Sequence, residues 1–250
     1  VANEQAPSSS VPRAISEWLI QGTGAGDRVL LYFSGHGSQV PDESGDEKDG
    51  SDEVLCLHDL NVVNNEGDKT LQGVYADDDF YQQLVSLSDR EVLVILDSCH
   101  SGTATKGLSL EPRSLPVDRA QVKFFHYQGM PRGAGFKGNF AAKPHSDEEQ
   151  GAGAEEAEYV ALSSCRDDEK SLATAQGSIF TIGLRQAVKE ASAQKGQITP
   201  ADIQQKVTTF VHQQLPDSKK FHPQITGSAA LQQKPLQLVA SGNGRGQVWQ

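Results

Sequence analysis

Two apolar runs dominate the first hundred positions of the chain, at Arg28–Phe33 and Val92–Leu96. Each has the length of a strand and no polar alternation, which is typical of strands covered on both faces in a parallel sheet. The pattern predicts a third strand at Val54–Leu57, a helix over residues 10–22 and another helix that begins near Asp77. Strands that alternate with helices in this way predict an α/β layered fold.

The second half of the chain begins with a long stretch without period. Residues 103–157 mix glycine, proline and charge, which predicts a linker. Order resumes with a strand at 158–164, helices at 178–191 and 199–215, and a short strand at 235–239. We therefore divide the chain into a first catalytic part, a linker, a second part and a tail: 1–102, 103–157, 158–240 and 241–250.

Charge and composition exclude some partners. The 250 residues carry a formal net charge of -11, which would repel nucleic acid and anionic membranes and attract a cationic substrate. The apolar runs are far shorter than the roughly 20 residues that span a bilayer. The first residues lack the features of a signal peptide, and the three cysteines have no metal-type spacing. We therefore expect three thiols in a cytoplasmic protein.

Both apolar runs end in short, turn-forming segments that present a reactive side chain. Ser34-Gly35-His36-Gly37-Ser38 follows the first run, and Asp97-Ser98-Cys99-His100 follows the second. Because ligands bind beyond the carboxyl ends of strands in open α/β sheets, we expect the two segments to meet. Cys99 would then be the nucleophile, His36 its acid/base partner, and the backbone amides of Gly37 and Cys99 the donors to the oxyanion.

Less specific interpretations exist for both residues. A lone cysteine at the end of an apolar strand is usually a small buried core residue, and a lone histidine is no stronger a signal. His100 is a competing base, although a sequence neighbour often points away from the nucleophile. The two segments together, each with one member of a nucleophile and base pair, favour catalysis.

These motifs resemble those of a known family. The metacaspase signature is similar to three segments of this chain: Tyr32-Phe33-Ser34-Gly35-His36-Gly37-Ser38-Gln39, Asp49-Gly50-Ser51-Asp52-Glu53 and Asp97-Ser98-Cys99-His100-Ser101-Gly102. Residues 161–169 resemble the start of the small-subunit-like region of that family. The nearest subgroup is the prokaryotic orthocaspases. The resemblance implies a caspase-like three-layer sandwich, with a mostly parallel central sheet and helices on both faces. It makes residues 1–102 large-subunit-like and 158–240 small-subunit-like.

A carboxylate two residues before the nucleophile has consequences for specificity. Asp97 can lie in the pocket for the residue that precedes the cut bond, where it would pair with Arg or Lys. The resemblance gives Asp97 that role and adds Ser34 to the same pocket. True caspases match less well, because their Gln-Ala-Cys segment is replaced here by Asp97-Ser98-Cys99. The alternative for Asp97 is a structural cap or turn carboxylate.

Calcium is a weaker prediction. Asp52, Asp77 and Asp78 match aspartates that bind the ion in calcium-activated metacaspases, but a fourth matching position is Lys106. A cation in place of a ligand carboxylate would weaken binding, so we expect no cofactor and no calcium requirement. The alternative is a solvated acidic surface, with Asp77 and Asp78 at a helix start.

The linker is a candidate substrate for the enzyme itself. The resemblance implies self-processing, and the sequence does not choose among the basic residues; the alternative is a basic loop that is never cut. The candidates are Lys106, Arg113, Arg119, Lys123, Arg132, Lys137 and Lys143.

One part of the family pattern is absent from this chain. The family domain normally begins with an apolar strand, so an upstream segment of the same precursor is a candidate partner. The predicted function is a cysteine endopeptidase that cuts protein or peptide substrates after Arg or Lys through a thioester. The rival from another class is a catalytically silent caspase-like scaffold, and legumain-like or gingipain-like peptidases are nearer alternatives with different pockets.

Overall fold

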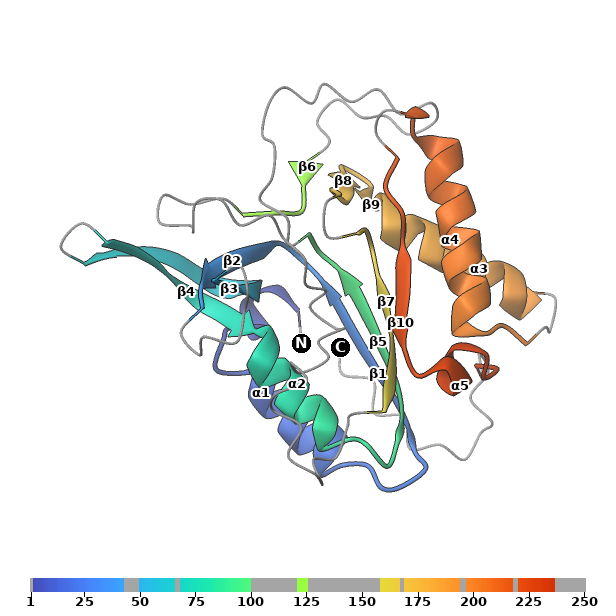
Figure 1. The fold of residues 1–250 in the computed structure, drawn as a ribbon, viewed down its shortest axis with the longest axis horizontal. Coiled ribbons are helices and arrows are strands. Elements are labelled where there is room, and N and C mark those ends of the chain that lie inside the picture. The colour runs from blue at the N-terminus through green and yellow to red at the C-terminus, as the bar shows by residue number, and fades with distance from the viewer. Residues whose placement is uncertain are drawn as a thin grey trace.

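The computed structural model describes residues 2–42, 50–65, 68–99, 121–125, 158–166, 169–193, 197–217 and 220–236. Its elements, shown in Figure 1, are in chain order η1 (Asn3–Gln5), α1 (Val11–Ala14), the π-helical η2 (Ile15–Ile20), β1 (Arg28–Ser34), β2 (Gly37–Pro41), β3 (Ser51–Asn65), β4 (Asp68–Ala76), α2 (Asp77–Val85), β5 (Glu91–Asp97), β6 (Gln121–Val122), β7 (Tyr159–Ser163), β8 (Leu172–Thr174), β9 (Gly177–Ser178), α3 (Ile179–Ala193), α4 (Pro200–Gln214), β10 (Gln224–Gly227) and α5 (Ala229–Gln232).

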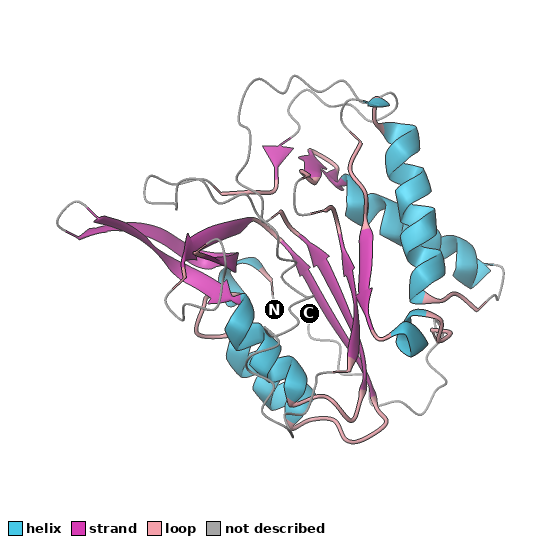
Figure 2. Ribbon diagram, viewed as in Figure 1, coloured by secondary structure: helices cyan, strands magenta, loops and turns pink. Residues whose placement is uncertain are grey.

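The central sheet has four strands among the described residues, in the order β1-β5-β7-β10. Strand β5 pairs in parallel with both β1 and β7, and β10 closes the sheet in antiparallel pairing with β7 (Figure 2). The predicted α/β fold with a mostly parallel central sheet is thereby confirmed. The proposed division of the chain stays a prediction, although strands from both predicted parts lie in this one sheet.

Alternation along β5 explains how both faces of the sheet are covered. Val92, Val94 and Leu96 belong to one apolar cluster, which includes side chains of η2 and α2. Leu93 and Ile95 belong to another, which is built largely from α3 and α4. Successive strand residues point to opposite faces, so the apolar run supplies both cores at once. The helices accordingly lie on the two sides of the sheet (Figure 1).

Strand β1 departs from the prediction. Its run of apolar residues indicated burial on both faces, but Leu30 is 60% exposed and Tyr32 is 46% exposed. Among the described strands, β1 is at the edge of the sheet, and α3 and α4 lie on the side of β7 and β10 (Figure 1). The described helices therefore cover one face of β1 only in part, and the prediction was wrong for that face.

A second sheet holds the strand predicted at Val54–Leu57. That strand is longer than expected and forms the middle of the antiparallel sheet β2-β3-β4, which projects away from the central sheet (Figure 2). Of the side chains that the structure describes on this strand, only those of residues 51–57 are buried, so the apolar pattern marked part of its buried first half, where Val54 packs with Leu71 of β4. This sheet matters for the site because β2 begins directly after His36.

The predicted helices are present. The helix predicted over residues 10–22 consists of α1 and η2, α2 begins at Asp77 as predicted, and α3 and α4 match the predictions at 178–191 and 199–215. Thr199 and Asp202 form a capping box at the start of α4. The strand predicted at 235–239 lies largely outside the described residues, as does the tail, although Leu236 forms a single bridge with Ile198.

Two further findings concern the class of protein. None of the described helices has the length and apolar character needed to cross a bilayer. Cys56, Cys99 and Cys165 are all buried free thiols, as predicted.

Candidate active site

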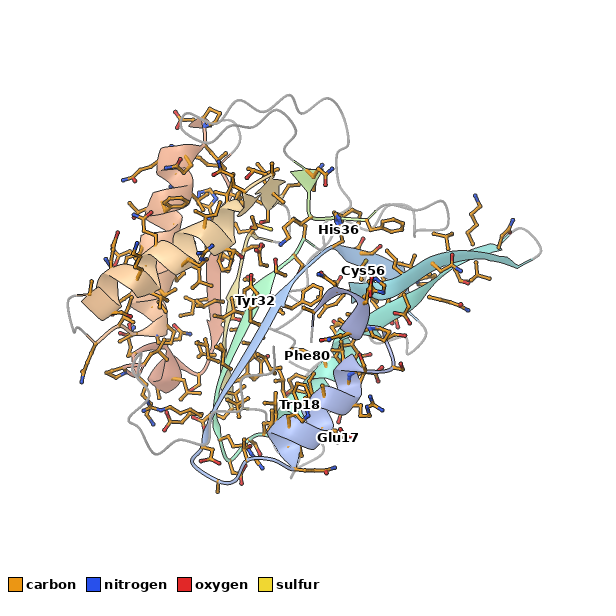
Figure 3. All side chains as sticks on the ribbon, turned by 180° about the vertical axis from the view of Figure 1, so that it is seen from behind. Glu17, Trp18, Tyr32, His36, Cys56 and Phe80 are labelled. Carbon is orange, nitrogen blue, oxygen red and sulfur yellow. The ribbon has the colours of Figure 1, made fainter. Side chains whose placement is uncertain are left out.

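The parallel pairing of β1 with β5 aligns the two predicted motifs. Ser34, the last residue of β1, lies opposite Asp97, the last residue of β5, and its hydroxyl donates to the Asp97 carboxylate at 3.2 Å. His36 follows β1, at the point where the chain passes into β2 (Figure 3), and Cys99 follows β5. The structure thus brings the predicted strand ends to one edge of the sheet.

Asp97 lies at the base of a polar pocket and is itself fully buried. Its carboxylate has no exposed surface and accepts hydrogen bonds from Ser178 at 2.8 Å, from Ser171 at 3.4 Å and from Thr181. A buried carboxylate must be supplied with donors, and these hydroxyls come from the part of the chain beyond the linker. Sequence reasoning missed all three: Ser178 and Thr181 lie before and within the first turn of α3, where they read as ordinary caps, and Ser171 only precedes the short strand β8.

The pocket contains a lysine of the chain itself. The Lys123 ammonium lies 3.0 Å from an Asp97 carboxylate oxygen and donates to the Ser34 hydroxyl at 2.7 Å. Its side chain is only 7% exposed. Burial lowers the pKa of Lys123, and the attraction of Asp97 offsets part of that effect. The predicted pocket residues Asp97 and Ser34 therefore bind a cationic side chain in this structure.

The backbone around Lys123 is held as firmly as its side chain. Residues 121–125, which we name the cleft segment, include β6, and β6 pairs in antiparallel fashion with β8. The Lys123 amide donates to the Ser171 carbonyl at 3.2 Å, and the Phe125 amide donates to the Gly37 carbonyl at 2.8 Å. The cleft segment belongs to the stretch predicted as an irregular linker, and it is the only part of that stretch that the structure describes.

Two backbone amides converge on the carbonyl oxygen of Lys123. The Gly37 amide donates to it at 3.1 Å and the Cys99 amide at 3.0 Å. These are the two amides predicted to hold an oxyanion, and their distances match the range expected of such donors. When a nucleophile attacks the carbonyl carbon, negative charge develops on the oxygen. The two amides are placed to stabilise that charge.

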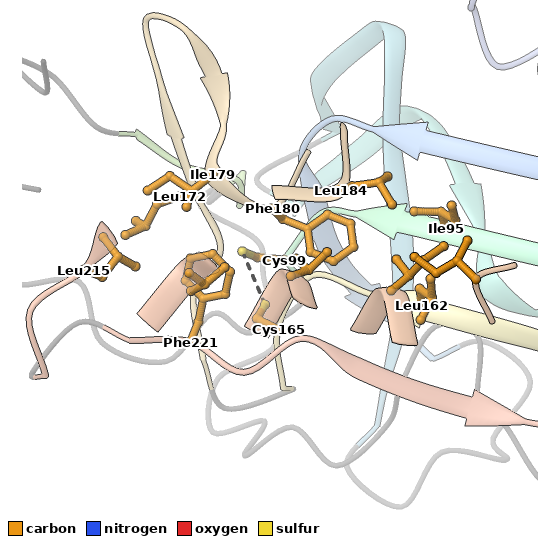
Figure 4. Packing of buried hydrophobic residues seen from close by; sticks show 14 of the residues in the cluster. Ile95, Cys99, Leu162, Cys165, Leu172, Ile179, Phe180, Leu184, Leu215 and Phe221 are labelled. Carbon is orange, nitrogen blue, oxygen red and sulfur yellow. Dashed lines mark hydrogen bonds between the residues drawn. The ribbon is translucent and has the colours of Figure 1, made fainter. Parts of the chain in front are cut away.

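The Cys99 side chain is fully buried and belongs to the apolar cluster of Leu172 and Phe221. Its sulfur accepts the Ser171 amide at 2.8 Å and lies 3.9 Å from the sulfur of Cys165 (Figure 4). The hydrogen bond to Cys99 and burial raise the pKa of Cys165, so that residue stays a thiol. Among the described residues, no hydrogen bond joins the Cys99 sulfur to the His36 ring. Cys165 is a neighbour of the site to which the sequence analysis assigned no role there.

His36 stands at the rim of the site. The residue keeps much of its surface exposed, but partial burial of its ring, and then the nearby Lys123 ammonium, lower its pKa. A lowered pKa keeps the imidazole neutral near pH 7, as a base requires. Burial also raises the pKa of Cys56 to about 12, which makes that thiol unreactive. The competing base, His100, lies outside the described residues.

The calcium candidates lie apart from these contacts. Asp52 is on β3, while Asp77 and Asp78 begin α2; Asp52 and Asp77 are buried. In the part of the chain that the structure describes, no group of three or more His, Cys, Asp or Glu side chains could hold a metal ion. Lys106 lies outside the described residues, so calcium dependence stays untested.

Comparisons with known proteins agree with this geometry. Residues 2–235 match the caspase domain family model. The chain is similar to Metacaspase-1 of Arabidopsis thaliana, with 32% identity over 177 residues that make up 70% of this chain and 40% of the relative. It is also similar to Metacaspase-1 of Cryptococcus neoformans, with 36% identity over 121 residues, which are 44% of this chain and 24% of that one. The chain thus spans less than half the length of either relative.

A solved structure gives the same result for the fold. A protein from Geobacter sulfurreducens superposes with a TM-score of 0.60 and 23% sequence identity, and the match covers 93% of this chain and 78% of that one. At this identity the likeness concerns the fold alone.

Proposed function

Because this chain belongs to the caspase domain family of peptidases, we propose that it is a cysteine endopeptidase that cuts protein or peptide chains after Arg or Lys. The observation that supports this proposal most directly is the placement of Lys123. Its ammonium is bound by Asp97 while its carbonyl oxygen is bound by two amides. A residue bound at both ends in this way has the position of the one that precedes a cut bond.

Each residue of the site has a chemical role in this proposal. Asp97 and Ser34 bind the cationic side chain of the substrate, and the amides of Gly37 and Cys99 hold its carbonyl oxygen. His36 takes the proton of the Cys99 thiol, the thiolate attacks the carbonyl carbon, and the imidazolium passes that proton to the leaving amine. Water then hydrolyses the thioester, with the same imidazole as its base. The low pKa of His36 allows it to begin the cycle as a neutral base.

The pocket also explains why a cation is preferred to a neutral residue. Asp97 has no exposed surface, so water cannot compensate its charge when the pocket is filled by an apolar side chain. An ammonium or guanidinium provides the missing countercharge, and the guanidinium adds a second donor. We therefore expect both Arg and Lys to be accepted, and Asp to be rejected by repulsion.

Peptide hydrolysis tests the proposal. The protein is first incubated by itself, so that any self-processing can occur. Matched fluorogenic peptides that end in Arg, Lys, Asp or Asn are then added, with calcium or with a chelator. We expect turnover after Arg and Lys only, at the same rate in both buffers. Cys99→Ala should abolish it, whereas Cys56→Ala, which removes another buried thiol, should retain it. Folding of each variant is checked by thermal unfolding.

The other outcomes identify the rival functions. Cleavage after Asn or Asp alone would overturn the pocket assignment. A well-folded protein that hydrolyses none of the peptides would favour a silent scaffold. Strict dependence on calcium would refute the expectation of a cofactor-free enzyme.

A further inference from the structure

We propose that the cleft segment, residues 121–125, is the chain's own first substrate, and that it blocks the cleft until the bond between Lys123 and Phe124 is cut. This inference rests on the proposed peptidase function and goes beyond it in naming the bond and the inhibitor. Seven basic residues in the linker were candidates from the sequence. One of them, Lys123, is bound in the site.

The backbone of the cleft segment is bound as a substrate strand would be. It adds to the edge of β8, where Gln121 lies opposite Ala173 and Val122 opposite Leu172. Addition of a strand to a sheet edge is a common way to bind an extended peptide, because main-chain hydrogen bonds hold any sequence in register. The register here ends at Lys123, whose carbonyl reaches the two amide donors.

Residues on both sides of Lys123 fill apolar sites. Val122 and Phe124 pack against the cluster that contains Leu172 and Phe221. Phe125 packs instead against the cluster of Val54 and Leu71 in the second sheet. The cleft therefore favours substrates with an apolar residue before the Arg or Lys and apolar residues after the cut bond.

A simple structural ion pair does not account for these contacts. A buried lysine needs only a carboxylate nearby, and the pair between Lys123 and Asp97 would satisfy that need with any backbone path. The observed path also aligns the Lys123 carbonyl with the amides of Gly37 and Cys99, and the next residue but one with the Gly37 carbonyl. These additional contacts are those that a peptide bond requires before attack.

The chemistry of the cut balances within the site. His36 takes the proton of the Cys99 thiol, and the sulfur forms a bond to the carbonyl carbon of Lys123. The bond from that carbon to the Phe124 nitrogen breaks, and His36 passes the same proton to the new amine. One water then splits the thioester, which leaves a carboxylate on Lys123 and an amine on Phe124. In the described state the sulfur accepts the Ser171 amide at 2.8 Å and lies 3.9 Å from the Cys165 sulfur, so attack on the carbonyl carbon competes with these contacts.

The same contacts make the intact segment an inhibitor. A segment tethered in the same chain is present at an effective concentration of the order of millimolar, without dilution. Any peptide in solution must displace it from the pocket and from the edge of β8. We therefore expect the uncut chain to bind other substrates poorly, and cleavage to relieve that block.

The cut is tested by mapping fragments of the full chain. Wild type, Cys99→Ala, Lys123→Ala, Lys123→Arg and Lys137→Ala are incubated, and the fragments are identified by intact mass and N-terminal sequencing. We expect a fragment that begins at Phe124 from wild type, from Lys123→Arg and from Lys137→Ala, which removes another lysine of the linker. Cys99→Ala and Lys123→Ala should not produce it.

These outcomes separate the inference from the function on which it depends. Hydrolysis of Arg and Lys peptides without a fragment that begins at Phe124 would overturn the inference and leave the peptidase proposal standing. Failure of both assays with folded protein would overturn the peptidase proposal itself. If purified Cys99→Ala protein also yields a fragment that begins at Phe124, a contaminating protease makes the cut, and self-cleavage is refuted.

The block is tested without catalysis, by calorimetric binding of acetyl-Gln-Val-Arg-amide to inactive proteins. We expect the peptide to bind Cys99→Ala/Lys123→Ala at least about tenfold more tightly than Cys99→Ala, because the tethered competitor has lost its anchor. Cys99→Ala/Lys137→Ala is the matched control and should bind like Cys99→Ala. Equal affinity for all three folded proteins would refute the inhibitory role. When Asp97→Asn is added to Cys99→Ala/Lys123→Ala, the tighter binding of the peptide should be lost.

Discussion

Replacement of Asp97 by asparagine removes the charge of the pocket with almost no change of shape. Asp97 has no exposed surface, and the Lys123 side chain is 7% exposed. The Lys123 ammonium nitrogen lies 3.0 Å from an Asp97 carboxylate oxygen. The removal of one partner from such a buried charge pair costs about 2–5 kcal/mol. Because 1.36 kcal/mol corresponds to a factor of ten in rate, kcat/KM for Arg and Lys peptides should fall about 30-fold or more. The surrounding hydroxyls can turn to accept from the new amide, so the fold should persist.

The loss must be specific to cationic substrates. Steady-state hydrolysis is measured with peptides that carry Arg, Lys or the neutral residue Gln before the cut bond. Glu91→Gln is the matched control: Glu91 begins the strand that Asp97 ends, and it pairs with Arg28 at 2.9 Å and Lys234 at 2.6 Å at the opposite end of the sheet. Exposed pairs of this kind contribute little, so its kcat/KM should change less than about twofold.

Asp97→Asn also releases the cleft segment from its anchor, which would raise activity. Asp97→Asn is therefore compared with its parent in the Lys123→Ala background, in which that anchor is already absent, so the measured loss reports the charge alone. An equal loss for Gln and Arg peptides would mean that Asp97 supports the structure without selecting the substrate. A loss of less than about fivefold for Arg peptides, against the 2–5 kcal/mol expected of a buried pair, would refute the assignment of the pocket.

Three other changes follow from single contacts. Ser178→Ala removes a 2.8 Å hydrogen bond to the buried pocket carboxylate and should cost about 1–3 kcal/mol of stability, seen as a lower melting temperature, whereas Ser86→Ala, at an exposed hydroxyl, should not. Thr199→Ala removes the capping box of α4 and should lower the free energy of unfolding in urea by about 1 kcal/mol. In an NMR titration of inactive protein, Lys123→Gln should raise the pKa of His36, because an ammonium that disfavours the imidazolium is lost; an unchanged or lower pKa would contradict the contact.

The strand ends of the site could be predicted because parallel pairing is a regular geometry. Two apolar runs of equal length that pair side by side must bring the residues that follow them to one edge of the sheet. Ser34 and Asp97 therefore meet as the sequence pattern indicated. The exposure of Leu30 and Tyr32 was not predictable in the same way, because an apolar run does not reveal which strand lies at the edge.

The rest of the pocket depends on contacts between distant segments. Ser171, Ser178 and Thr181 reach Asp97 from more than seventy positions away in the chain, and nothing in their local sequence marks them. The choice of Lys123 among the basic residues of the linker has the same cause. The choice of Lys123 depends on the register of β6 against β8. A strand of two residues is too short to leave a recognisable pattern in the sequence.

The contacts of Lys123 also set a condition on how the enzyme can be controlled. Each interaction that makes the cleft segment a good inhibitor, at Asp97, at Gly37 and at the edge of β8, also positions its peptide bond for attack. A tighter segment therefore blocks other substrates better and is cut no less readily, so affinity alone cannot keep the enzyme inactive. What remains to control the cut is the hydrogen bond from the Ser171 amide to the Cys99 sulfur, which competes with attack on the Lys123 carbonyl. Changes that stabilise the sulfur in its present position should slow activation without weakening the pocket.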